Sequence, residues 1–167
     1  MKKLEVFFDY YCPYCLKGHE QLLDFVPTQP KLEVIWHPCE IYKLPTNYSG
    51  TKHSDLCIQG MYFAMDNKID LWDYHKKIYS LIFTDRVNVD NVKVFTKALD
   101  GFFDTNAFVE AVNSGKYVEK VNETNHYAFH ATGVHVVPTF RADNGFLQDR
   151  QEFFNMGPSS TSYNGSK

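Results

Sequence analysis

Short apolar runs and one amphipathic stretch alternate along the first part of the chain. Residues 4–8 and 32–36 are brief runs of aliphatic, β-branched and aromatic side chains, which are typical of β-strands. Between them, residues 13–26 place leucine, phenylalanine and valine at helical spacing, and Pro27 and Pro30 end the stretch. The pattern predicts a strand, a helix and a second strand, which together form a βαβ unit.

A longer helical part follows a polar loop. Residues 40–53 carry proline, asparagine and glycine without a periodic apolar face, and so predict a loop. Beyond it, Ser54 or Asp55 can cap a first helix, and Gly133 stops the last one. The predicted helices cover residues 54–67, 69–83, 90–99, 105–115 and 117–131.

The period changes once more after the helices. Residues 134–140 are rich in valine and lead into a predicted strand, and a second strand-like run begins at Phe146. Asp143-Asn144-Gly145 lies between them, and Asn-Gly in such a place is a strong signal for a hairpin. The predicted fold class is therefore α/β: a βαβ unit, an all-helical insertion at about 54–132, and a final pair of strands.

Length and charge limit the number of domains and the kinds of partner that we expect. The chain of 167 residues fits one domain with a substantial core, and 14 phenylalanines and 11 tyrosines make it rich in aromatic rings. A net charge of −3 gives no electrostatic reason to expect nucleic acid or an anionic membrane as a partner. No apolar run approaches the roughly 20 residues that span a bilayer.

The N-terminus begins with a methionine and two lysines, followed by apolar residues, as a signal peptide does. Glu5 and Asp9 interrupt the apolar stretch, and no small-residue cleavage site precedes Cys12. We therefore interpret residues 4–8 as the first strand of the mature protein and expect the chain to be cytoplasmic.

Cys12-Pro13-Tyr14-Cys15, directly after the first predicted strand, carries the most informative chemistry of the chain. Proline is favoured at the first position of a helix, which places Cys12 at a helix N-terminus. Unpaired N–H groups and the helix dipole favour negative charge there, so the pKa of a thiol falls below its usual value of about 8.5. A thiolate attacks disulfides, and a second cysteine one turn away resolves the mixed disulfide. The motif predicts a dithiol redox site.

The remaining cysteines and two histidines have less specific interpretations. Cys39 and Cys57 can form a second disulfide, act as a relay to Cys12, or be small buried hydrophobic side chains, as free cysteines commonly are. Zinc bound by all four cysteines would need a second close pair, which the sequence lacks, so no metal site is expected. We interpret His19 as a surface residue and His135 as a candidate for the rim of the redox site.

Two motifs and their order give a family resemblance. Cys12-Pro13-Tyr14-Cys15 follows the first strand, Val137-Pro138-Thr139-Phe140 opens a late strand, and helices fill the interval. This order resembles the thioredoxin superfamily, and the helical insertion resembles that of its DsbA-like branch. The run Phe8-Asp9-Tyr10-Tyr11 before the first cysteine is most similar to cytoplasmic FrnE-like members. The resemblance covers roughly residues 3–150 and implies a thioredoxin-like domain over residues 1–155.

The resemblance implies a role for each matching residue. Cys12 corresponds to the attacking cysteine, Cys15 to the resolving cysteine, and Pro138 to a proline that relatives hold in the cis form beside the active site. Val137 and Thr139 would adjoin the substrate, the backbone of Val137 pairing with an extended chain by strand addition.

The resemblance also assigns the residues around the dithiol. Pro13 and Tyr14 would face the substrate, and residues in their position tune the redox potential in relatives. Relatives often bear an acidic residue beneath the active site, which would transfer protons. Asp9 and Glu5 are the candidates, and the sequence does not choose between them. No metal or organic cofactor is implied.

The C-terminus departs from the family pattern. After the last strand relatives carry a closing helix, whereas here Phe153-Phe154 leads into a tail rich in serine, threonine and glycine. We expect residues 156–167 to be disordered because they contain few apolar side chains. Either the closing helix is absent and a second copy covers the sheet in a homodimer, or the C-terminus is altered.

Three functions fit these observations. The first is a thiol–disulfide oxidoreductase that acts on a protein or a small thiol. The second is a glutathione-dependent isomerase or transferase of the chromene-carboxylate isomerase or kappa-class type; such relatives usually keep a single nucleophile, which the intact cysteine pair argues against. The third is a non-catalytic module that binds partners beside the cis-proline.

Overall fold

The computed structural model describes residues 1–43 and 53–155, and its strands form a four-stranded sheet in the order β2-β1-β3-β4. Their bounds are Lys3–Phe8 for β1, Glu33–Pro38 for β2, Thr139–Arg141 for β3 and Leu147–Asp149 for β4. β1 is parallel to β2, whereas β3 is antiparallel to both β1 and β4. Parallel neighbours need a crossover connection, and helix α1, Pro13–Phe25, supplies it.

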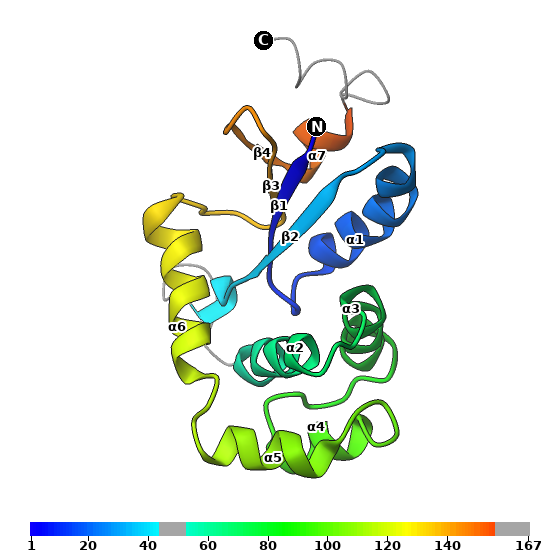
Figure 1. Cartoon of the computed structure of the whole chain (residues 1–167), viewed down its shortest axis with the longest axis vertical. Helices are drawn as coiled ribbons and strands as arrows, with labels where there is room; N and C mark the ends of the chain where they lie inside the picture. The colour runs from blue at the N-terminus through cyan, green and yellow to red at the C-terminus, as the bar shows by residue number, and fades with distance from the viewer. Residues whose placement is uncertain (44–52, 156–167) are drawn as a thin grey trace.

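The helical insertion follows β2 in the sequence and lies beyond one end of the sheet (Figure 1). Its helices are α2, Asp55–Asp66; α3, Leu71–Tyr79; α4, Val92–Ala98; α5, Thr105–Asn113; and α6, Val118–His126. α3 and α6 each continue into a π-helical turn, η3 at Ser80–Thr84 and η4 at Tyr127–Ala131. None of the helices in the described part of the chain is long and apolar enough to cross a membrane.

Different helices cover the two faces of the sheet. Val6 and Phe8 point from β1 into the main core, which they share with Leu22 of α1. Phe7, between them, points to the opposite face and packs with Ala128 of η4, because successive side chains of a strand alternate between faces. Figure 1 shows α1 and α6 on opposite sides of the sheet.

The insertion is joined to the sheet by a cluster of buried rings. The Tyr10 hydroxyl, just beyond β1, hydrogen-bonds to Nδ1 of His75 on α3 at 3.0 Å. His19 of α1 packs among Trp36, Trp72 and His75, with ring centroids 6.0, 5.3 and 5.8 Å away. The expectation that His19 lies on the surface was wrong: its side chain is 5% exposed, because this face of α1 packs against α3.

The C-terminal part contains a closing helix, which the sequence pattern did not indicate. Helix α7 spans only Arg150–Asn155, too short to display a helical period. Its Phe153 is buried and stacks on Phe140 of β3 with ring centroids 4.7 Å apart. The chain itself therefore covers this face of the sheet. Residues 156–167, predicted to be disordered, lie outside the described residues, and the homodimer stays a prediction.

The late strand into which residues 134–140 were expected to lead spans Thr139–Arg141. β3 begins at Thr139, because the preceding segment approaches the start of α1 instead of pairing with a strand. The remaining cysteines, Cys39 and Cys57, are both free and fully buried, which agrees with the interpretation of small buried hydrophobic side chains.

Gly60 of α2 offers a test of packing inside the insertion. A Cβ at Gly60 would lie 2.2 Å from the Tyr74 hydroxyl oxygen, which is buried and donates to the Cys57 carbonyl at 2.5 Å. We expect Gly60→Ala to lower the free energy of unfolding by about 1–3 kcal/mol, measured by urea titration. The cost should shrink in a Tyr74→Phe background, where the clashing oxygen is gone. Equal costs in both backgrounds would contradict the clash.

The pH dependence of stability tests the burial of His19. Burial lowers the pKa of His19 from 6.5 to about 4, so the unfolded chain binds the proton more readily, and stability from this residue is lost as the pH falls through 6.5 towards 4. We expect the free energy of unfolding of His19→Leu, relative to the original chain, to improve by roughly 3 kcal/mol between pH 7 and pH 4. Denaturant titrations at several pH values measure this difference, and a difference that is constant with pH would refute it.

Candidate active site

Cys12 is held at the start of α1 by backbone hydrogen bonds. Its N–H donates to the Asp9 carbonyl at 3.0 Å, which turns the chain sharply after β1. Pro13 follows as the first helical residue. The Cys12 sulfur then takes the place of an N-cap oxygen: it accepts the backbone N–H of Cys15 at 3.2 Å. The reactive atom is thus fixed at a helix N-terminus, where negative charge is favoured.

The two thiols of the motif have opposite electrostatic environments. The pKa of Cys12 is lowered, first because the Cys15 thiol hydrogen-bonds to its sulfur, and also because the backbone N–H groups of Cys15 and Tyr14 do so. The pKa of Cys15 is raised well above its ordinary value, chiefly by complete burial and by the same contact with Cys12. A thiolate at Cys12 beside a neutral thiol at Cys15 is the resulting arrangement.

The segment before β3 forms the other wall of the site. The Val137–Pro138 peptide bond is cis. The Cys12 thiol donates to the Val137 carbonyl at 3.6 Å. Pro138 packs against α1 so closely that a Cβ at Gly18 would lie 3.3 Å from its Cγ. Val137 and Pro138 are therefore adjacent to the start of α1, although they lie far from it in the sequence.

A cavity of about 260 Å³ opens at Cys12. Its lining residues are Cys12, Tyr14, Ile41, Tyr42, His135, Val136 and Val137. Tyr14 and Val136 are 63% and 45% exposed, so the entrance is apolar and accessible. His135 lies at this rim, as its place near Pro138 predicts.

Two predicted site residues lie beside the cavity without lining it. Thr139 is buried, and its hydroxyl donates to the Val136 carbonyl at 2.7 Å, so it braces the segment beside the cavity instead of lining it. Pro13 is exposed next to the cavity and does not line it.

Ile41 and Tyr42 were missed, because they fall in the stretch interpreted as a polar loop. A short helical turn, η2, Ile41–Lys43, carries them. Its position directly after β2 was the available signal, since reactive groups gather at the carboxyl ends of parallel strands.

Asp9 is the acidic residue beneath the thiols. It is 1% exposed, and its carboxylate oxygens accept the backbone N–H groups of Tyr11 at 3.0 Å and Tyr42 at 3.2 Å. Burial outweighs these bonds and raises its pKa from 3.8 to about 6. The backbone N–H of Asp9 also hydrogen-bonds to the Cys15 sulfur, which places this residue against the resolving thiol.

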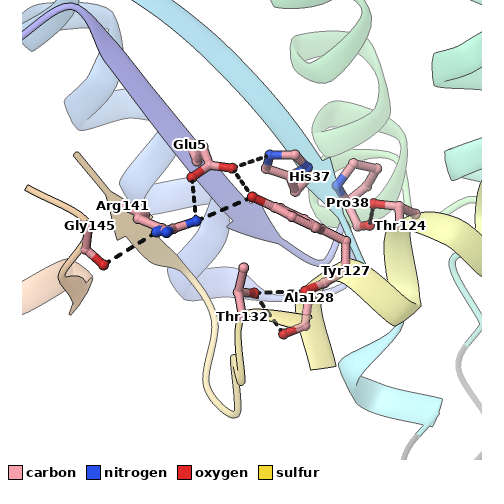
Figure 2. Close-up of polar contacts among 9 residues, drawn as sticks. All are labelled: Glu5, His37, Pro38, Thr124, Tyr127, Ala128, Thr132, Arg141 and Gly145. Carbon is pink, nitrogen blue, oxygen red and sulfur yellow. Dashed lines mark hydrogen bonds and ion pairs between the residues drawn. The ribbon is translucent and has the colours of Figure 1, made fainter. Parts of the chain in front are cut away.

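Glu5, the other acidic candidate, belongs to a separate polar cluster on the sheet. Figure 2 shows its carboxylate between His37, Tyr127 and Arg141. One oxygen meets Nε2 of His37 at 3.0 Å and accepts the Tyr127 hydroxyl, and the other accepts Nη1 of Arg141 at 3.2 Å. This cluster ties η4 to the strands. Within residues 1–43 and 53–155, no group of three histidine, cysteine or acidic side chains is placed to hold a metal ion.

Comparisons with known proteins bear on the family and the fold. A family model described as the DSBA-like thioredoxin domain matches residues 3–90, just over half of the chain. No protein with curated annotation matches significantly.

Solved structures share the fold at low sequence identity. A probable DsbA oxidoreductase from Streptomyces coelicolor has a TM-score of 0.74 at 15% identity, over 99% of this chain and 92% of that one. The DsbA of Pseudomonas aeruginosa has a TM-score of 0.70 at 16% identity, over 96% of this chain and 78% of that one. A 2-hydroxychromene-2-carboxylate isomerase has a TM-score of 0.67 at 14% identity, over 96% of this chain and 95% of that one.

At these identities the structural neighbours show the fold alone. The family model, the sheet order and the placement of the helical insertion agree, and they confirm the resemblance to the DsbA-like branch. The chain is a member of the DSBA-like thioredoxin domain family.

Proposed function

We propose that the protein is a thiol–disulfide oxidoreductase whose reacting atoms are the sulfurs of Cys12 and Cys15. The unequal pair of thiols carries this proposal: a stabilised thiolate at the cavity lies in hydrogen-bond contact with a fully buried neutral thiol. A dithiol of this kind accepts and donates two electrons without a metal or an organic cofactor.

In the reductive direction, the Cys12 thiolate attacks one sulfur of a substrate disulfide. A mixed disulfide with Cys12 forms, the substrate S–S bond breaks, and the other substrate sulfur leaves as a thiolate. Asp9 then takes the proton of Cys15, and the Cys15 thiolate attacks the Cys12 sulfur. The Cys12–Cys15 disulfide forms and the second substrate thiolate leaves, so the substrate gains the two electrons that the protein loses. The oxidative direction is the exact reverse.

We propose an extended peptide chain, or a small thiol, as the substrate. The accessible side chains of Tyr14 and Val136 flank the cavity, and the backbone of Val137 beside Cys12 supports pairing with an extended chain. The isomerase alternative has a fold of the same type in its favour. Because that chemistry requires one nucleophile, the buried partner thiol at Cys15 favours disulfide exchange.

Serine substitutions at the two cysteines test the proposed chemistry. Cys12→Ser should reduce the rate of insulin disulfide reduction to the uncatalysed level, because the hydroxyl is not ionised at neutral pH. Cys15→Ser should still attack but accumulate a mixed disulfide with the substrate, detectable by mass spectrometry. Cys57→Ala, which removes a buried thiol that does not line the cavity, is the control for folding. Full activity in Cys12→Ser would refute the proposal, and glutathione-dependent turnover that survives Cys15→Ser would favour the isomerase.

The pH dependence of the second step tests the role of Asp9. Its carboxyl has a pKa of about 6, so the base form appears as the pH rises through 6. The rate at which Cys15 resolves a preformed mixed disulfide should rise through the same pH, measured by rapid acid quench. Asp9→Asn should slow this step by about 100-fold and remove the inflection. An unchanged inflection in Asp9→Asn would assign the proton transfer to another group.

A further inference from the structure

The turn after β2 brings a tyrosine to the attacking sulfur. Tyr42 is half-buried and lines the same 260 Å³ cavity as Cys12. Its backbone N–H donates to Oδ2 of Asp9 at 3.2 Å, so one residue contacts both the acid beneath the thiols and the cavity above them. None of the roles derived from the motifs involves Tyr42.

The turn that carries Tyr42 is held in place on both sides. The backbone N–H of Cys39 donates to the Phe8 carbonyl at 2.7 Å and extends the pairing of β1 with β2. The next residue, Glu40, is clamped by Asn125 of α6: its N–H donates to the amide oxygen at 2.9 Å, and its carboxylate accepts the amide N–H at 2.9 Å. The position of Tyr42 therefore follows from the sheet and from the insertion together.

We propose that Tyr42 is a catalytic residue whose hydroxyl donates a hydrogen bond to the Cys12 thiolate in the reduced protein and as Cys12 leaves the mixed disulfide. The inference rests on the proposed function and deepens it. Tyr42 and Cys12 line the same cavity, and a hydrogen bond from the Tyr42 side chain is one of the contacts that lower the pKa of Cys12. A hydrogen bond to a charged group is worth more than one between neutral groups, and more again in a site that excludes water.

Tyr42 acts at the two steps in which the Cys12 sulfur carries negative charge: its attack on a substrate disulfide and its departure from the mixed disulfide. The largest stabilising contact of the Cys12 thiolate comes from the Cys15 thiol. The Cys15 thiol is also a reactant of the cycle, whereas the Tyr42 hydroxyl keeps its proton and takes no part in the exchange of bonds. In the oxidative direction, a substrate thiolate attacks the substrate sulfur of the mixed disulfide, and the bond to Cys12 breaks. Cys12 leaves as a thiolate, and Tyr42 stabilises the charge that develops on it.

Removal of the hydroxyl tests the proposal. In Tyr42→Phe, the pKa of Cys12, measured from the ultraviolet absorbance of the thiolate against pH, should rise by about one unit. With both pKa values below the working pH, the dithiol–disulfide equilibrium against glutathione should shift about tenfold towards the disulfide. That factor corresponds to a reduction potential about 30 mV lower. The backbone N–H that holds Asp9 is retained in this variant.

Two further proteins separate a direct contact from a structural effect. Tyr11 precedes Cys12 in the sequence, but its hydroxyl hydrogen-bonds to Asp90, so Tyr11→Phe should leave the pKa of Cys12 unchanged. A ring-fluorinated tyrosine at position 42 has a more acidic hydroxyl, and it should lower the pKa of Cys12. Loosened packing would not raise the pKa of Cys12 in one Tyr42 variant and lower it in the other.

The outcomes also separate this inference from the proposed function. An unchanged pKa of Cys12 in both Tyr42 variants overturns the role of Tyr42, whatever the activity. Equal shifts in Tyr42→Phe and Tyr11→Phe overturn it as well. If the pKa shifts as expected but the original chain does not exchange insulin disulfides, the contact stands and the proposed function fails.

Discussion

The hydrogen bond from the Cys15 backbone N–H to the Cys12 sulfur determines how the rest of the site is built. It requires Cys12 to lie just outside the helix, in extended backbone, with Pro13 in the first helical position. Cys15 is then one turn further on, inside the protein, with its thiol directed at the sulfur that it must later attack. One local geometry therefore produces both the stabilised thiolate and the buried resolving thiol.

The strands of the sheet position the other residues of the site around this helix terminus. β1 delivers Asp9 beneath the thiols, β2 leads into the turn with Tyr42, and β3 begins directly after Pro138. Each of these segments enters from a different part of the chain, and the order β2-β1-β3 makes them neighbours. The dithiol follows β1, which lies between β2 and β3 in the sheet. The segments next to β2 and β3 can therefore reach the site from either side of β1.

The elements with a regular period could be predicted from the sequence, and so could the roles suggested by local motifs. The βαβ unit, the helical insertion and the position of Cys12 at a helix start all follow from short-range patterns. What depends on long-range packing could not be predicted. His19 looks like a surface residue because nothing in the sequence says that α3 covers its face of α1. Helix α7 could not be predicted because six residues are too few to show a helical period. The role of Tyr42 could not be predicted because a short turn has no regular pattern of apolar residues.

Two buried groups described separately act against each other over one range of pH. Asp9 binds its proton more tightly in the folded protein than in the unfolded chain, so its contribution to stability is lost as the pH rises from about 4 to 6. His19 binds its proton less tightly when folded, so its contribution grows over nearly the same range. Their opposite slopes offset one another. Asp9 can therefore gain or lose its proton near pH 6 with a smaller net change in the stability of the fold, because His19, between the sheet and the insertion, changes stability in the opposite direction.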